Sequence, residues 1–230
     1  MDGLRTSKTV SNVDLVHNYY YVGSRLEYET IGDSEALWYF YDADGNPSGI
    51  RYKKNGVSQD YYFVCNWRGD VVQIYNTSGE LVATYDYDAW GRVVENSTDQ
   101  DTQNIAEANP IRYRGYYYDT ETRLYYLKSR YYDPATKRFL NADGLVSSSI
   151  EDVAKNMFTY CLNNPVIYVD SEGNCPYKPT SYDFYRMNHG LPAAGCTCKN
   201  YKVPTTLNMV NPDKTEERAF AAMESVVTLK

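Results

Sequence analysis

Apolar residues occur in short runs rich in aromatic and β-branched side chains, and polar or glycine-containing segments separate these runs. Such residues favour the pleated surface of a strand, and short runs of them between turn residues are typical of β-strands. Runs of this kind lie at residues 61–65, 71–75, 81–85 and 124–127. The pattern predicts a mainly β chain whose strands form an antiparallel meander.

A repeated pattern separates the predicted strands: Tyr, then Asp or Asn, two variable residues and Gly. It occurs at residues 41–45, 75–79 and 87–91, and copies without the glycine follow at 118–123 and 132–137. The Asp or Asn side chain can accept backbone amides at the start of a turn, and glycine supplies the positive φ that closes it. We therefore expect residues 35–93 to form consecutive antiparallel strands, with hairpin tips at 44–45, 78–79 and 90–91 or one residue away.

The rest of the chain lacks this alternation. Residues 95–109 are polar without a strand pattern and predict a long surface loop. A short helix is expected near 149–158 and a second at about 213–228, where apolar residues have helical spacing, and 175–204 is loop-like. The predicted organisation is a block of YD-repeat hairpins at 1–94, the loop at 95–109, a core segment at 110–174, and a small, partly helical C-terminal tail at 175–230.

Composition and charge narrow the functional classes. The chain has 26 Tyr against 6 Phe, and its formal net charge of −7 offers no broad basic surface for nucleic acid. The sequence contains neither a long apolar run nor an N-terminal apolar segment, which predicts no membrane span and no signal peptide. The chain expressed alone is therefore expected in the cytoplasm, and export would depend on a longer parent protein.

Residues 109–119, 124–134, 138–143 and 160–173 together resemble the RHS-repeat-associated core of RHS/YD-repeat proteins, and the likeness extends over 1–174. The resemblance implies a bacterial polymorphic toxin of the wall-associated type, secreted or at the cell surface, with a β-shell around a C-terminal toxin. Its expected partners are a further YD-repeat chain or parent shell, and an immunity protein for the tail. Residues 2–8 look like the back half of a repeat, so the chain is expected to begin inside one, as a fragment truncated at its N-terminus.

The resemblance also implies a candidate catalytic pair. In some relatives two aspartates cut the chain just after the core; Asp143 and Asp170 match their positions, and the cut would fall between Asn174 and Cys175. Two adjacent carboxylates can share a proton and activate water. The alternative is that each aspartate opens a turn, which we favour because turn-forming aspartates are far more common than catalytic ones.

Three departures from the family pattern also argue against cleavage. Gly144 and Ser171 replace the prolines that follow the two aspartates, and Asn174 replaces the expected leucine at the cut. Too few strands are present to enclose a cargo, so the pair is expected to be open to water, where two aspartates ionise separately. We therefore predict that the chain stays intact.

The tail carries four potential zinc ligands, Cys175, His189, Cys196 and Cys198. Their spacing is not that of a structural zinc site, because only one residue separates the last two cysteines. We expect no metal and no cofactor, and a solvated His189 in place of a catalytic one.

Three functional hypotheses remain open. The favoured one is a non-enzymatic scaffold that carries a variable tail. The second is a self-cleaving aspartyl protease core. The third is a surface adhesion module that binds carbohydrate or protein through tyrosine-rich strand faces, which a large exposed aromatic patch would support.

Overall fold

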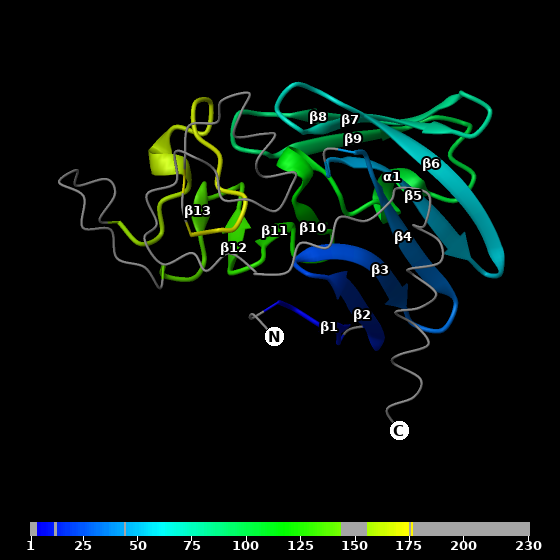
Figure 1. Cartoon of the computed structure of the whole chain (residues 1–230), viewed down its shortest axis with the longest axis horizontal. Helices are drawn as coiled ribbons and strands as arrows, with labels where there is room; N and C mark the ends of the chain where they lie inside the picture. The colour runs from blue at the N-terminus through cyan, green and yellow to red at the C-terminus, as the bar shows by residue number, and fades with distance from the viewer. Residues whose placement is uncertain (1–3, 12, 44, 144–155, 175, 177–230) are drawn as a thin grey trace.

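The computed structural model describes residues 4–11, 13–43, 45–143, 156–174 and 176. Nine strands form one antiparallel sheet in which the order in space follows the order in the chain (Figure 1). This arrangement confirms the mainly β fold and the meander. The strands are β1 Ser7–Val10, β2 Leu15–Val22, β3 Arg25–Ile31, β4 Glu35–Tyr41, β5 Pro47–Lys54, β6 Val57–Cys65, β7 Val71–Asn76, β8 Leu81–Tyr87 and β9 Val93–Ser97.

A second antiparallel sheet contains four shorter strands, again in chain order. These are β10 Tyr117–Asp119, β11 Leu124–Leu127, β12 Arg130–Asp133 and β13 Arg138–Phe139. The described helical elements are the short helix α1 Ile105–Ala108 and the 3-10 turns η1 Tyr113–Gly115 and η3 Cys161–Asn163. Figure 1 shows the smaller sheet beside the nine-stranded sheet.

The repeat turns have the predicted chemistry. Asp88 Oδ1 accepts the amide of Arg92 at 3.0 Å, and Gly91 has a φ of 86°. The same bond, from the amide of the fifth residue to the side chain of the first, closes the turns that begin at Asp42, Asn66 and Asn76. The expected tips at residues 45, 78–79 and 90–91 are therefore confirmed; residue 44 is outside the described residues.

The two copies without glycine also form hairpin tips, each one residue longer. Arg123 and Lys137 occupy the left-handed region in place of glycine, with φ of 60° and 65°. Their amides donate to the carbonyls of Asp119 and Asp133 at 2.7 and 2.8 Å. These turns thus form without glycine, and Arg123 and Lys137 adopt a backbone conformation that is unfavourable for residues with a side chain.

Two buried clusters form the core. The first joins the inner face of the large sheet, including Leu37, Ile50 and Tyr61, to Ile105 and Tyr117 from the segment that follows it. The second is dominated by tyrosines of the small sheet and of the segments directly before and after it; its members include Tyr113, Tyr116, Tyr125, Tyr132, Phe139 and Tyr160. Because apolar residues of the later segment complete the first cluster, the two sheets are packed through shared core residues.

The expectation of a surface loop at 95–109 was partly wrong: residues 98–104 form turns and are mostly exposed, but the segment also contains the end of a strand and a helix. β9 continues to Ser97, and α1 lies within the segment with Ile105 fully buried. The Asp101 carboxylate accepts the amides of Ile105 and Ala106 at 2.6 and 3.0 Å, so a residue typical of loops caps a helix start. Two buried apolar residues, Ile105 and Ala106, are enough to pack α1 because it has only one turn.

Other expectations fall mostly outside the described residues. The predicted loop at 175–204 lies almost wholly outside the described residues, and the predicted helix at 213–228 lies outside them entirely. Most of the predicted helix at 149–158 is also outside them, and its described end, Met157 and Phe158, is a turn. In the part of the chain that the structure describes, no helix is long and apolar enough to cross a membrane.

Candidate functional site

Arg130 brings the two predicted aspartates together. It opens β12, and its side chain is 4% exposed. Its Nη2 atom lies 3.0 Å from Asp143 Oδ2 and 3.5 Å from Asp170 Oδ2. The carboxylates come from segments on opposite sides of residues 144–155, so tertiary folding assembles this ion triad.

The same guanidinium also binds the backbone around the triad. Nε donates to the Gly173 carbonyl, and Nη1 donates to the Met157 carbonyl at 2.9 Å. The guanidinium carbon lies 3.6 Å from the centre of the Phe139 ring. Burial lowers the pKa of Arg130, and the two carboxylates act in the opposite direction. The sequence analysis missed Arg130, although it lies in one of the segments that carry the family resemblance.

The expectation that the pair is open to water was wrong. The Asp170 side chain is 1% exposed and that of Asp143 is 13% exposed. Tyr116 helps to enclose Asp170, because its hydroxyl donates to the Asp170 carbonyl at 3.0 Å and lies 3.3 Å from the Asp170 amide. The surrounding tyrosine cluster therefore supplies a dry environment even without further strands.

Asp170 also opens a turn, as the favoured alternative required. Its Oδ1 accepts the amide of Asn174 at 3.0 Å, and Gly173 has a φ of 75°. Ser129 Oγ donates to the Glu172 carbonyl at 2.6 Å, which fixes this turn against the β11–β12 hairpin. The turn and the ion triad are thus two roles of one side chain. Cys175, on the far side of the expected cut, is outside the described residues.

The zinc candidates Cys175, His189, Cys196 and Cys198 all lie outside the described residues. Among the residues that are described, no group of three or more His, Cys, Asp or Glu side chains could hold a metal ion. Burial raises the pKa of the Cys65 thiol to about 11 and raises that of Cys161 further. Both thiols are therefore poor nucleophiles near neutral pH.

His17 and Glu29 form a second buried polar cluster. His17 Nδ1 lies 2.6 Å from Glu29 Oε1, and the hydroxyls of Tyr39 and Tyr117 donate to the same carboxylate at 2.6 to 3.0 Å. Glu29 is fully buried. Since Tyr117 belongs to β10, this cluster joins the two sheets and has a structural role.

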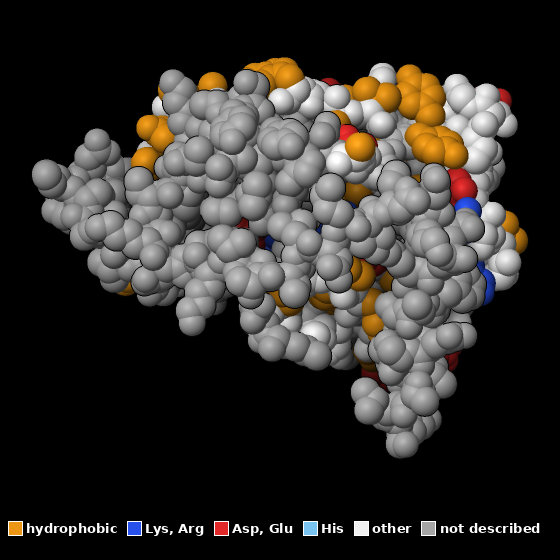
Figure 2. Space-filling view, in the orientation of Figure 1, with side chains coloured by type: hydrophobic (Ala, Val, Ile, Leu, Met, Phe, Trp, Pro, Cys, Tyr) orange, Lys and Arg blue, Asp and Glu red, His pale blue; other side chains and the backbone are white. Residues whose placement is uncertain are grey.

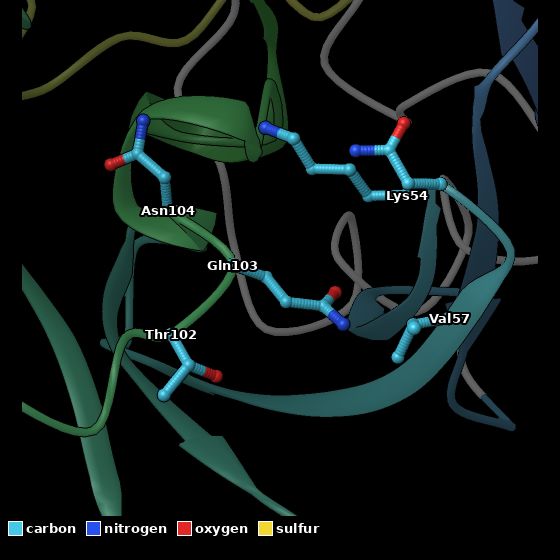
Figure 3. A pocket seen from close by; sticks show the side chains of 6 residues that line it. Lys54, Val57, Thr102, Gln103 and Asn104 are labelled. Atoms are coloured by element: carbon cyan, nitrogen blue, oxygen red, sulfur yellow. The ribbon is translucent and has the colours of Figure 1, made fainter.

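A cavity of about 490 Å³ lies between the β5–β6 turn and the segment before α1. Figure 3 shows Lys54 crossing one side of it and Gln103 entering from the other. Its lining residues, Lys54, Asn55, Val57, Thr102, Gln103 and Asn104, include no carboxylate, histidine or cysteine. A second cavity, of about 310 Å³, lies beside the turn at 66–70, the end of β8 and the start of the turn at 88–92. Asp143 and Asp170 line neither.

Exposed apolar side chains are spread over the surface. Trp67 is 78% exposed, Tyr62 50% and Val64 43%. Figure 2 shows hydrophobic side chains in separate patches along the visible rim, over β6 to β8.

Comparison with known proteins assigns the class. The family model of the teneurin YD-shell matches residues 27–166. The tRNA3(Ser)-specific nuclease WapA of Bacillus spizizenii is 38% identical over 174 residues, which are 75% of this chain. The chain therefore belongs to the teneurin YD-shell family, and its resemblance to RHS/YD-repeat proteins is confirmed.

Two further relatives extend the comparison. Toxin protein Tse5 of Pseudomonas aeruginosa is 29% identical over 118 residues, 51% of this chain and 8% of that protein. The crystal structure of TcdB2-TccC3 matches with a TM-score of 0.55 and 21% identity, over 75% of this chain and 9% of that one, and supports the fold alone. The chain spans only 7% of the length of WapA from B. spizizenii.

Proposed function

We propose that this chain is a structural shell segment of an RHS-type toxin system, with residues 4–174 as scaffold and the tail as a variable module. The observation that carries the proposal is the continuous nine-stranded meander, whose inner face is completed by the segment that leads to the small sheet. Turns of one kind join β4 to β5, β6 to β7, β7 to β8 and β8 to β9, so further repeats can extend the meander without a new type of contact.

The proposed partners are further YD repeats, in the same or another chain, at a secreted or cell-surface location, and an immunity protein for the tail. β1 and β9 are the outermost strands of the described sheet, and an outermost strand offers backbone groups for pairing. The test is to mix the chain with separately expressed YD repeats of WapA from B. spizizenii and to measure mass by light scattering. A one-to-one complex is expected. A matched repeat chain with proline in its last strand should not bind, because proline removes a ladder donor. Equal behaviour of the two repeat chains would contradict the proposal.

A second candidate function is self-cleavage after Asn174, and the observation that favours it is the approach of Asp143 and Asp170 in a largely dry site. One carboxylate would take a proton from the attacking water while the other donated one to the leaving amine. Arg130 weakens this candidate because its guanidinium pairs with both carboxylates, and a buried cation between two carboxylates is the arrangement of a structural ion triad. The scaffold remains the better supported function.

A further inference from the structure

The N-terminal arm, defined here as residues 4–10, is held to the molecule mainly through its basic side chains. Within the described residues, β1 forms the edge of the large sheet and has β2 as its one partner strand (Figure 1). Its side chains are exposed or half-buried along its whole length. Strand pairing therefore buries little apolar surface, and a specific attachment must come from elsewhere.

Arg5 provides that attachment by entering an aromatic cage. Its guanidinium carbon lies 4.5 Å from the ring centre of Tyr126, 4.6 Å from Tyr19, 5.0 Å from Tyr117 and 5.9 Å from Tyr131. Each ring face attracts the positive charge, so four rings attract this guanidinium more strongly than a single surface cation–π contact would. The cage is built by β2, β10, β11 and β12, so it spans both sheets.

Acidic side chains also bind the basic residues of the arm. Asp119, whose side chain is 2% exposed, binds Arg5 with two contacts of 2.6 and 3.1 Å. Lys8 lies 2.7 Å from Asp119 and 2.6 Å from Glu121. Two parallel bonds to a carboxylate match the planar guanidinium and not a lysine ammonium. The aromatic cage together with Asp119 and Glu121 is called the slot here. The slot therefore distinguishes an arginine position from a lysine position three residues later.

The slot also binds the backbone of the arm. Tyr126 accepts the amide of Arg5 at 2.8 Å, and Tyr21 donates to its carbonyl at 3.1 Å. The amide of Tyr19 donates to the Thr6 carbonyl at 2.9 Å. Backbone bonds beside a strand edge, together with pockets for particular side chains, are the elements of peptide recognition by strand addition.

We propose that this slot is a binding site for an extended peptide that carries Arg and, three residues later, Lys, and that the chain's own arm occupies it in the closed state. The arm is an exchangeable strand at the edge of the sheet. The same segment of a second copy of the chain enters the slot when the arm leaves. This interaction is independent of the scaffold proposed above and of any cleavage at Asn174.

The test uses the full chain with Arg5→Ala and Lys8→Ala, which weakens the arm and leaves the slot unchanged. A fluorescent peptide of residues 4–11 is titrated into this variant and into the unsubstituted chain, and anisotropy is measured. Binding to the variant should be at least tenfold tighter, because in the unsubstituted chain the arm competes. Adding Asp119→Asn to the variant should abolish binding, and so should Arg5→Ala in the peptide.

Equal affinity for the two chains, or no binding to a folded double variant, would overturn the proposal. Near-UV circular dichroism checks the fold. If the double variant does not fold, Arg5→Lys replaces it, since lysine keeps the charge and loses the paired contacts with Asp119; the same two outcomes then decide. Mass by light scattering of the unsubstituted chain over a range of concentrations tests the exchange: a dimer that increases with concentration supports it, and a chain that stays monomeric throughout overturns it.

Discussion

The turn at 88–92 and the turn at 170–174 have one local structure and two environments. In both, the first residue is Asp, its Oδ1 accepts the amide of the fifth residue at 3.0 Å, and the fourth residue is glycine with positive φ. Asp88 is exposed, whereas Asp170 is fully buried beside Arg130. Asp170, a candidate catalytic residue, thus occupies the same position in its turn as Asp88 does in a repeat turn, but the surrounding packing buries it.

The comparison shows that the hydrogen bonds that form the turn and the environment of its carboxylate have separate causes. A short pattern dictates the turn because the bonds that form it lie within five residues. Whether its carboxylate faces a cation in a dry site depends on Arg130 and Tyr116, which are 40 and 54 residues away. The following predictions test this separation.

The largest effect is expected for Asp170→Ala. It should lower the free energy of unfolding by about 3–5 kcal/mol, since it leaves the buried Arg130 without one partner. Asp88→Ala should cost about 1 kcal/mol, the value for loss of a side-chain cap. Urea denaturation of both variants measures the difference, and equal losses would show that Asp170 does no more than close its turn.

Glycine substitutions should separate the two turns next. A Cβ on Gly173 would lie 2.6 Å from the Leu127 carbonyl oxygen and 2.8 Å from Ser129 Oγ, whereas one on Gly79 would meet nothing within 4 Å. Both residues have positive φ. Gly79→Ala should therefore cost about 1–2 kcal/mol for the backbone alone, and Gly173→Ala clearly more. The midpoints of thermal unfolding give the order, and a reversed order would refute the close packing of the turn at 170–174.

The fold was largely predictable because its signals are local. Alternation and Tyr-Asp-x-x-Gly spacing were sufficient for the meander and for three tips. They were not sufficient for the turn at 66–70, where Asn66 follows a cysteine in place of tyrosine, although its bonds are the same. α1 was missed because a single turn leaves no periodicity to detect, and Asp101 is equally typical of a loop and of a helix cap.

A smaller effect concerns pH. Burial raises the pKa of Asp70, which lies at the end of the turn at 66–70 and 3.8 Å from Arg114. A carboxyl group with a raised pKa in the folded state binds protons more readily there, so its contribution to stability falls as pH rises above the ordinary range of aspartate. The stability of the chain relative to Asp70→Asn should therefore decline as the pH rises above about 4, the ordinary pKa of aspartate. Urea denaturation at several pH values checks this, and a constant difference would contradict the raised pKa.

The smallest effect is expected in the copies that lost glycine. Arg123→Gly and Lys137→Gly remove an unfavourable left-handed conformation, which costs a side-chain-bearing residue about 1 kcal/mol. Greater freedom of glycine in the unfolded chain offsets part of this gain. Each variant should thus be slightly more stable, by less than about 1 kcal/mol. A clear loss of stability on urea denaturation would show that these side chains make contacts that outweigh the strain.

The site was only half predictable. Family spacing identified Asp143 and Asp170, and the turn motif predicted one role of Asp170. Neither signal reveals burial, so the pair was expected in water and was found largely dry. Arg130 could have been found from the sequence by asking which cation would compensate two buried carboxylates, since unpaired charges are costly in a protein interior.

The central claim, that Arg130 makes the aspartate pair a structural ion triad in a scaffold, is tested most directly by intact-mass measurement of the purified chain after days at pH 5 to 7. The account predicts one mass, that of the full chain, at every pH. Asp143→Asn and Asp170→Asn serve as matched controls and should also remain intact. A break after Asn174 in the unsubstituted chain that is absent from both variants would contradict the account and establish Asp143 and Asp170 as a self-cleaving pair.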